Sequence, residues 1–120
     1  MDNKTAAMMH GDISPFNAEC IDGVFSLTLD IDGEYCADIF AQREDEDFEG
    51  NGYDWESIAT VYLNEKAPAL IPFAEFDSEA GMFCVYFEEE EPFREFVSGF
   101  IAAVNDREVL ADLFSRAEII

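Results

Sequence analysis

Residues 82–104, MFCVYFEEEEPFREFVSGFIAAV, contain both kinds of element from which the fold is built. The run from Met82 to Phe87 is almost entirely apolar, which is typical of a central strand of a sheet. Four glutamates follow, and Pro92 fits the first turn of a helix, where a missing N–H costs nothing. Apolar residues then recur at helical spacing and predict an amphipathic helix. They are Phe93, Phe96, Val97, Phe100, Ile101 and Val104.

Residues 24–41 predict a β-hairpin on the N-terminal side of this stretch. The segment 24–31 is rich in β-forming residues and alternates weakly between apolar and polar positions. Asp32-Gly33 is a turn signal, and 35–41 follows it as the second strand. A further strand near residues 13–20 would make a three-stranded meander.

Residues 54–67 predict a second helix. Asp54 is the expected N-cap, and Pro68 ends the helix. Between the two helices, residues 73–77 pair with 82–88 in a second strand pair. The apolar stripe of this helix consists of Trp55, Ile58, Ala59, Tyr62 and Leu63, with the stem of Lys66 at its end.

Together these elements predict an α+β fold in the order β-β-β-α-β-β-α-α. It is a mostly antiparallel sheet of about five strands with three helices packed on one face. The third helix is a short terminal one, because Asn105 and Glu108 have capping-box spacing. We expect one domain over residues 1–120, in which 1–12 form a mobile arm.

The charge of the chain narrows its possible partners. There are 28 Asp plus Glu against 6 Lys plus Arg, which gives a formal net charge of -22. The chain is also 49% hydrophobic and 14% aromatic, so it predicts a packed core rather than a disordered acidic segment. Such a charge repels nucleic acid and anionic membranes, and we expect neither as a partner. It suits a strongly basic protein.

The sequence lacks the motifs of catalysis and of metal or cofactor binding. It has one histidine, His10, and its three cysteines lack zinc-site spacing. It has no phosphate-binding glycine loop and no dinucleotide fingerprint. We therefore expect no enzyme, no cofactor, no metal and no small-molecule substrate. The N-terminus does not resemble an export signal, and no apolar run is long enough to span a membrane, so we expect a cytoplasmic protein.

Two acidic runs supply the candidate contact residues. Both precede predicted helices, where the helix dipole stabilises carboxylates, and this accounts for their placement but not for the net charge. We therefore favour a surface that steers a basic partner. We expect Trp55 in the core and Tyr53 at the surface. The candidate partner-binding residues are Glu44, Asp45, Glu46, Asp47, Glu49 and Tyr53, followed by Glu88, Glu89, Glu90 and Glu91.

The first acidic run also nearly matches a calcium-binding loop. Read from Asp45, acidic residues stand at positions one, three, five and twelve around Gly50, the twelfth being Glu56. However, position five is Glu49 rather than Asp or Asn, and position eight is Gly52 rather than an aliphatic residue. A predicted strand rather than a helix precedes the loop. We favour a plain acidic loop.

Three segments resemble the immunity protein 51 family of bacterial polymorphic toxin and contact-dependent inhibition systems. They are GNGYDWESIATVYLNEKAPAL (50–70), FDSEAGMFCVY (76–86) and LADLFSRAEI (110–119). Such proteins are described as single-domain cytoplasmic antidotes, encoded beside a toxin whose C-terminal domain they bind and block. The resemblance thus implies a cognate toxin domain as partner, and many such toxins are nucleases with cationic clefts. It assigns no contact residues, so the candidates above rest on charge density alone.

Three other functions remain open. An acidic DNA-mimic protein that sequesters a DNA-binding protein would also associate with a basic partner, and the identity of that partner separates the two. A small calcium-binding module would be stabilised by calcium against thermal unfolding. A hydrolase with a carboxylate pair would need a deep cleft in which the two pKa values differ.

The net charge predicts that salt stabilises the free protein. Between about 0.01 M and 0.15 M salt the Debye length falls from about 30 to about 8 Å, so repulsion between carboxylates weakens. The melting temperature, followed by circular dichroism, should rise over this range, and affinity for a basic partner should fall. A melting temperature that stays constant would show that the global repulsion is small.

Overall fold

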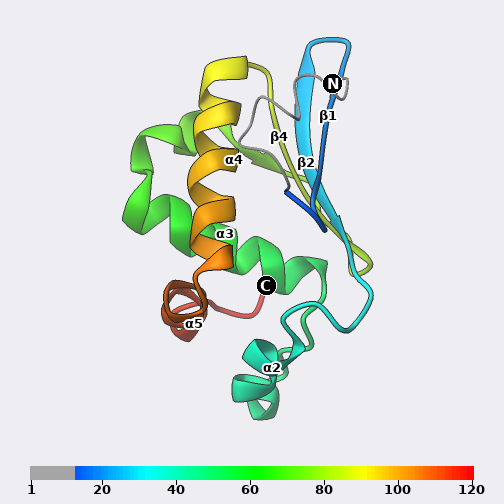
Figure 1. Cartoon of the computed structure of the whole chain (residues 1–120), viewed down its shortest axis with the longest axis vertical. Helices are drawn as coiled ribbons and strands as arrows, with labels where there is room; N and C mark the ends of the chain where they lie inside the picture. Colours follow the sequence, from blue (N-terminus) through cyan, green and yellow to red (C-terminus); the bar gives the residue numbers. More distant parts are fainter. Residues whose placement is uncertain (1–12) are drawn as a thin grey trace.

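The computed structural model describes residues 13–120, so the arm expected at 1–12 lies outside the described residues. It has an α+β architecture with an antiparallel four-stranded sheet in the order β1-β2-β4-β3, which confirms the predicted fold class (Figure 1). The α-helices, the 3-10 helices (η) and the strands are, in chain order, β1 (Asn17–Ile21), β2 (Val24–Asp30), α2 (Ala37–Phe40), η1 (Ala41–Glu46), α3 (Gly52–Lys66), η2 (Pro68–Phe73), β3 (Glu75–Phe76), β4 (Met82–Phe87), α4 (Glu90–Asn105) and α5 (Arg107–Ser115).

The core lies between the sheet and the helices. In the register of the sheet, Leu27 of β2 stands opposite Ala18 of β1 and Val85 of β4, so alternate residues of the strands point to the same face. Helix α4 packs against this face and fills it with aromatic rings, such as Phe100 at 6.0 Å from Phe83. The opposite face is mostly polar, and its exposed or half-buried residues include Asn17, Glu19, Ser26, Thr28, Asp30 and Tyr86.

Residues 35–41 do not form the predicted strand, so the prediction of five strands is wrong. The Asp32 carboxylate accepts hydrogen bonds from the backbone N–H groups of Glu34 and Tyr35 at 2.8 and 3.0 Å, which turns the chain away from the sheet. Ile39 and Phe40 are both buried, each with 3% of its surface exposed. In a strand these neighbours would point to opposite faces, whereas the short helix α2 buries both.

The hairpin of the N-terminal half is therefore formed by β1 and β2. These strands pair with Ile21 opposite Val24, and Asp22-Gly23 connects them. Both connecting residues have positive φ angles, 53° and 81°, as a two-residue hairpin turn requires. The strand predicted near 13–20 is thus present, shifted to Asn17–Ile21.

The three predicted helices are present as α3, α4 and α5. Pro92 lies in the first turn of α4, as predicted. The N-cap of α5 is Asp106 rather than Asn105, because the Asp106 side chain accepts the N–H groups of Glu108 and Val109. Trp55 has 1% of its surface exposed and Tyr53 has 39%, so both expectations for these side chains are confirmed.

A substitution at Gly52 tests how closely the start of α3 approaches the sheet. A Cβ atom at Gly52 would lie near the backbone oxygens of Glu79 and Met82, and the second of these distances would be 2.5 Å. Gly52→Ala should therefore lower the free energy of unfolding by about 1–3 kcal/mol, measured by urea denaturation. Gly81→Ala is the control, because a Cβ there meets no atom within 4 Å. Equal effects of the two substitutions would contradict the close approach.

Candidate functional site

The first acidic run forms a projection that we call the acidic knob, residues Glu44, Asp45, Glu46, Asp47 and Glu49. All five side chains are exposed. Phe48 interrupts them and is buried, with its ring 4.9 Å from that of Phe114 in α5. One apolar side chain thus attaches the knob to the core, and its carboxylates face the solvent.

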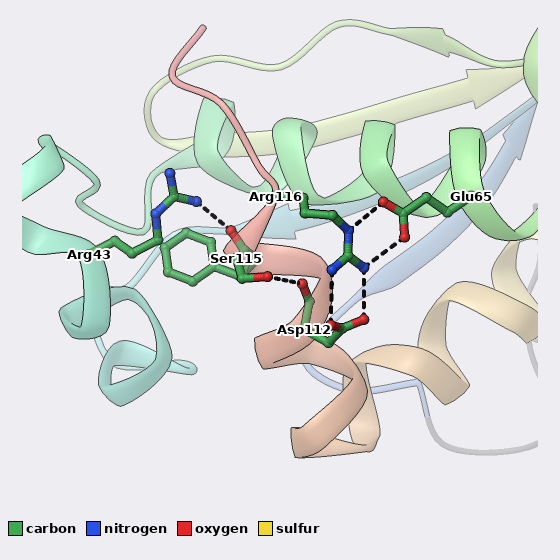
Figure 2. A network of polar contacts seen from close by, with 6 residues as sticks. Arg43, Glu65, Asp112, Ser115 and Arg116 are labelled. Atoms are coloured by element: carbon green, nitrogen blue, oxygen red, sulfur yellow. Dashed lines mark hydrogen bonds and ion pairs between the residues drawn. The ribbon is translucent and has the colours of Figure 1, made fainter.

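Arg43 holds the knob against the end of α5 (Figure 2). Its NH1 group donates hydrogen bonds to the carbonyl oxygens of Phe114 and Ala117, at 2.5 and 2.8 Å. Its Nε and NH2 groups donate to the Glu46 carboxylate at 2.9 and 3.0 Å, and this pairing lowers the pKa of Glu46. The guanidinium also lies over the rings of Phe48 and Phe114, at 4.4 and 5.1 Å. The knob is therefore fixed in place before any partner arrives.

Asp54 holds the other end of the knob. The prediction that Asp54 is the N-cap of α3 is wrong. The N-cap is Asn51, whose side chain accepts the Asp54 N–H at 2.9 Å. The Asp54 carboxylate completes the capping box and also accepts the N–H groups of Glu49 and Gly50, each at 2.8 Å. A carboxylate that receives several backbone N–H groups orders the loop around it. The misassignment arose because Asn and Asp are equally good N-cap residues.

Helix α5, to which Arg43 is bound, is itself tied to α3. Arg116 donates to the Glu65 carboxylate at 2.5 and 2.7 Å and to the Asp112 carboxylate at 2.9 and 2.7 Å (Figure 2). These contacts lower the pKa of both carboxyl groups. Ser57 donates to the carbonyl of Glu118 and accepts its N–H, so the C-terminal segment is fixed to α3 as well. The knob therefore rests on a rigid support.

The second acidic run, Glu88, Glu89, Glu90 and Glu91, lies where β4 leads into α4, and we call it the acidic turn. All four side chains are exposed. Glu90 pairs with Arg94 at 3.2 Å. The carboxyl-bearing residues Glu88 and Glu89 instead line a pocket of about 280 Å³, together with Pro72, Phe73, Glu75 and Tyr86.

Sequence reasoning missed four residues of this pocket. Glu75 and Tyr86 stand opposite each other in the pairing of β3 with β4, and the Glu75 carboxylate raises the pKa of Tyr86 by accepting its hydroxyl hydrogen bond. Phe73 is an exposed aromatic residue at the end of η2, next to Pro72. The alternation of β4 places Tyr86 off the core face, which is a signal that the sequence contains. The position of Glu75 beside Tyr86 depends on the register of β3 against β4, and the sequence does not reveal that register.

The two acidic clusters do not come together. The acidic knob follows α2 at one end of the long axis of the molecule, and the acidic turn lies at the other end, where α4 begins (Figure 1). Tyr53, in the first turn of α3, lies on the side of the knob in sequence, two residues after the N-cap. The predicted contact residues therefore belong to two separate surfaces.

Neither surface has the arrangement of a metal site. Within residues 13–120, no three His, Cys, Asp or Glu side chains are grouped so that they could hold a metal ion. In the near-match to a calcium loop, the Glu49 carboxylate accepts a hydrogen bond from the side-chain amide of Asn51 at 3.2 Å.

Among residues 13–120, no helix combines the length and the apolar character needed to cross a bilayer.

Comparison with known protein families gives a match over most of the chain. The family model for immunity protein 51 matches residues 19–119, a range that includes both acidic clusters and the pocket. No curated protein and no solved structure matches the chain.

The geometry of Arg43 predicts that lysine cannot replace it. Lys at this position would keep the charge but lose the planar fork that reaches two carbonyls and one carboxylate together. Arg43→Lys should lower the free energy of unfolding by about 1–3 kcal/mol in urea titrations. The matched control is Arg94→Lys, whose exposed pair with Glu90 should change stability by less than about 0.5 kcal/mol. Equal stability of the two variants would contradict the role of Arg43 as a clamp.

Proposed function

The chain belongs to the immunity protein 51 family, and from this membership we propose that it neutralises a cognate bacterial toxin by binding the toxin's C-terminal domain one-to-one. The observation that supports this function is the match to the family model over residues 19–119. An immunity protein acts by occupancy and not by turnover, so it requires a complementary surface rather than catalytic residues. We place its action in the cytoplasm and assign it to a single domain, 1–120.

The partner is a basic protein, and we propose a nuclease domain. A net charge of -22 attracts cations over long range and repels other acidic proteins. A cleft that binds the phosphates of nucleic acid presents Lys and Arg side chains, and an acidic protein competes for them. Electrostatic steering of this kind raises association rates, which suits an antidote that must capture a toxin quickly.

The distribution of the chain's own cations supports this proposal. Every arginine of the described residues is engaged in an ion pair within the chain: Arg43 with Glu46, Arg94 with Glu90, Arg107 with Asp38, and Arg116 with Glu65 and Asp112. In the acidic knob, Glu46 alone takes part in such a pair within residues 13–120. The other four carboxylates of the knob form no ion pair among residues 13–120, and Glu49 accepts a hydrogen bond from the Asn51 side chain.

We propose the acidic knob as the first contact surface, with Tyr53 beside it. The knob is exposed, and Arg43 and Asp54 fix its backbone before binding. A pre-ordered loop loses less conformational entropy on binding than a mobile one, so more of the contact energy appears as affinity. The carboxylates would cover the cleft that normally receives phosphates. The acidic turn is the second candidate surface.

The decisive experiment is co-expression with the C-terminal domain of the toxin encoded next to this protein. We expect growth to be restored and a one-to-one complex to co-purify, with an affinity that falls as salt rises. Toxicity without rescue or binding would refute the antidote function. Capture of host DNA-binding proteins in its place would support the DNA-mimic alternative.

The role of the knob is tested in the same complex. The triple variant Glu44→Gln, Asp45→Asn, Asp47→Asn leaves the Arg43 pair intact and should slow association by about tenfold at low salt, as measured by stopped flow. A control variant removes three exposed carboxylates that are absent from the ion pairs formed among residues 13–120: Glu19→Gln, Glu34→Gln, Glu108→Gln. Equal association rates for the two variants would show that only total charge matters and that the knob is not a contact surface.

A further inference from the structure

The pocket beside the acidic turn combines aromatic walls with carboxylates. It has a volume of about 280 Å³ and is lined by residues of η2, β3, β4 and the turn that follows β4. Phe73 has 39% of its surface exposed at this site, although an aromatic ring gains by leaving water. The lining thus offers apolar surface and negative charge within one hollow.

The carboxylates of the pocket have no cationic partner in the described part of the chain. Glu75, Glu88 and Glu89 are absent from the ion pairs formed among residues 13–120. Arg94, in the second turn of α4, pairs with Glu90 instead. An anionic or phosphate-bearing ligand would meet three like charges, so the pocket suits a cation.

The carboxylates also do not form a metal site, because no such group is present within residues 13–120. A cation that fits this pocket therefore contacts the aromatic side chains as well as the carboxylates. A guanidinium does both, since its faces stack on aromatic rings and its edges donate to carboxylates in pairs. The ammonium of Lys is more strongly hydrated and lacks the flat face.

The protein contains a filled example of this arrangement. The Arg43 guanidinium lies 4.4 Å from the centre of the Phe48 ring and 5.1 Å from that of Phe114, and it donates twice to one carboxylate, that of Glu46. The pocket offers the same groups, two aromatic side chains and acidic residues, from Phe73, Tyr86 and the three glutamates. What Arg43 does for the knob, an arginine from outside the chain can do in this pocket.

We propose that the pocket lined by Phe73, Tyr86 and Glu75, with Glu88 and Glu89 at the acidic turn, receives an arginine side chain of the toxin domain. This inference rests on the proposed function, because it names the chemistry by which the partner is held. Buried arginine and aromatic contacts are the kind that dominate binding energy in interfaces. The pocket therefore slows dissociation, whereas the acidic knob speeds association.

The test uses the complex of the full chain with the toxin C-terminal domain encoded beside it. The pocket variant is Glu75→Gln, Glu88→Gln, Glu89→Gln, and its affinity for the domain is compared with that of the wild type by isothermal titration calorimetry. We expect a loss of about 30-fold or more, which appears mainly as faster dissociation in surface plasmon resonance. Phe73→Ala, which changes no charge, should also weaken binding at least about tenfold. Cooperative unfolding at a melting temperature no lower than that of the wild type establishes that the charge variants are folded, and a far-UV circular dichroism spectrum like that of the wild type establishes it for Phe73→Ala.

The control is the triple variant Glu19→Gln, Glu34→Gln, Glu108→Gln, which removes the same charge and should weaken binding by less than about fivefold. On the toxin side, one Arg→Lys substitution should reproduce the loss, and combining it with the pocket variant should cause no further loss. Pocket variants that bind like the control would overturn the inference and leave the antidote function standing. A wild-type protein that does not bind the domain would refute the antidote function itself.

Discussion

The contact between β4 and α4 holds together a chain whose surface repels itself. Phe83 and Phe87 of the strand, and Phe93, Phe96 and Phe100 of the helix, have 0% of their surface exposed. Each fully buried side chain of this kind stabilises the fold by about 1.5–3 kcal/mol, and their edge-on and stacked ring contacts add to this. A formal net charge of -22 acts in the opposite direction. The aromatic layer therefore has to be large, and it explains the abundance of phenylalanine in an otherwise acidic chain.

The scarcity of cations has a structural consequence. With few arginines available, those of the described residues do not neutralise the surface evenly, and two of them, Arg43 and Arg116, hold separate segments of the chain together. Arg43 fastens the loop that carries the knob, and Arg116 joins α5 to α3 through the Glu65 carboxylate while Asp112 of α5 holds the same guanidinium. Exposed ion pairs contribute little stability by themselves. Their value here is positional, because the remaining carboxylates stay on ordered backbones and outside the ion pairs formed among residues 13–120.

Periodic elements could be predicted from the sequence because their signals are local. The apolar repeat of α4 and the apolar run of β4 each lie within one stretch, and both were placed within two residues of their observed bounds. The prediction of a strand over residues 35–41 follows β propensity, and it is wrong because the Asp32 carboxylate accepts the backbone N–H groups of Glu34 and Tyr35 and turns the chain. The pocket could not be predicted. It depends on the register that sets Glu75 beside Tyr86 and on η2, whose place follows from packing and not from periodicity.

In the proposed complex, the two separate acidic clusters have different roles. An interface of standard size covers about 800 Å² on each partner, a patch about 32 Å across, and the longest dimension of this molecule is 41 Å. An interface centred on one cluster is thus shorter than the molecule and does not have to include the other cluster. At low salt, where the Debye length is about 30 Å, the cluster that is not in the interface still attracts a basic partner without contact. Concave shape and exposed aromatic surface occur together with negative charge at the acidic turn, whereas the knob offers charge on a projecting loop. Close contact requires the combination found at the acidic turn, whereas long-range capture requires only the charge of the knob. Under the proposed function, one acidic chain can therefore bind a toxin domain both quickly and tightly.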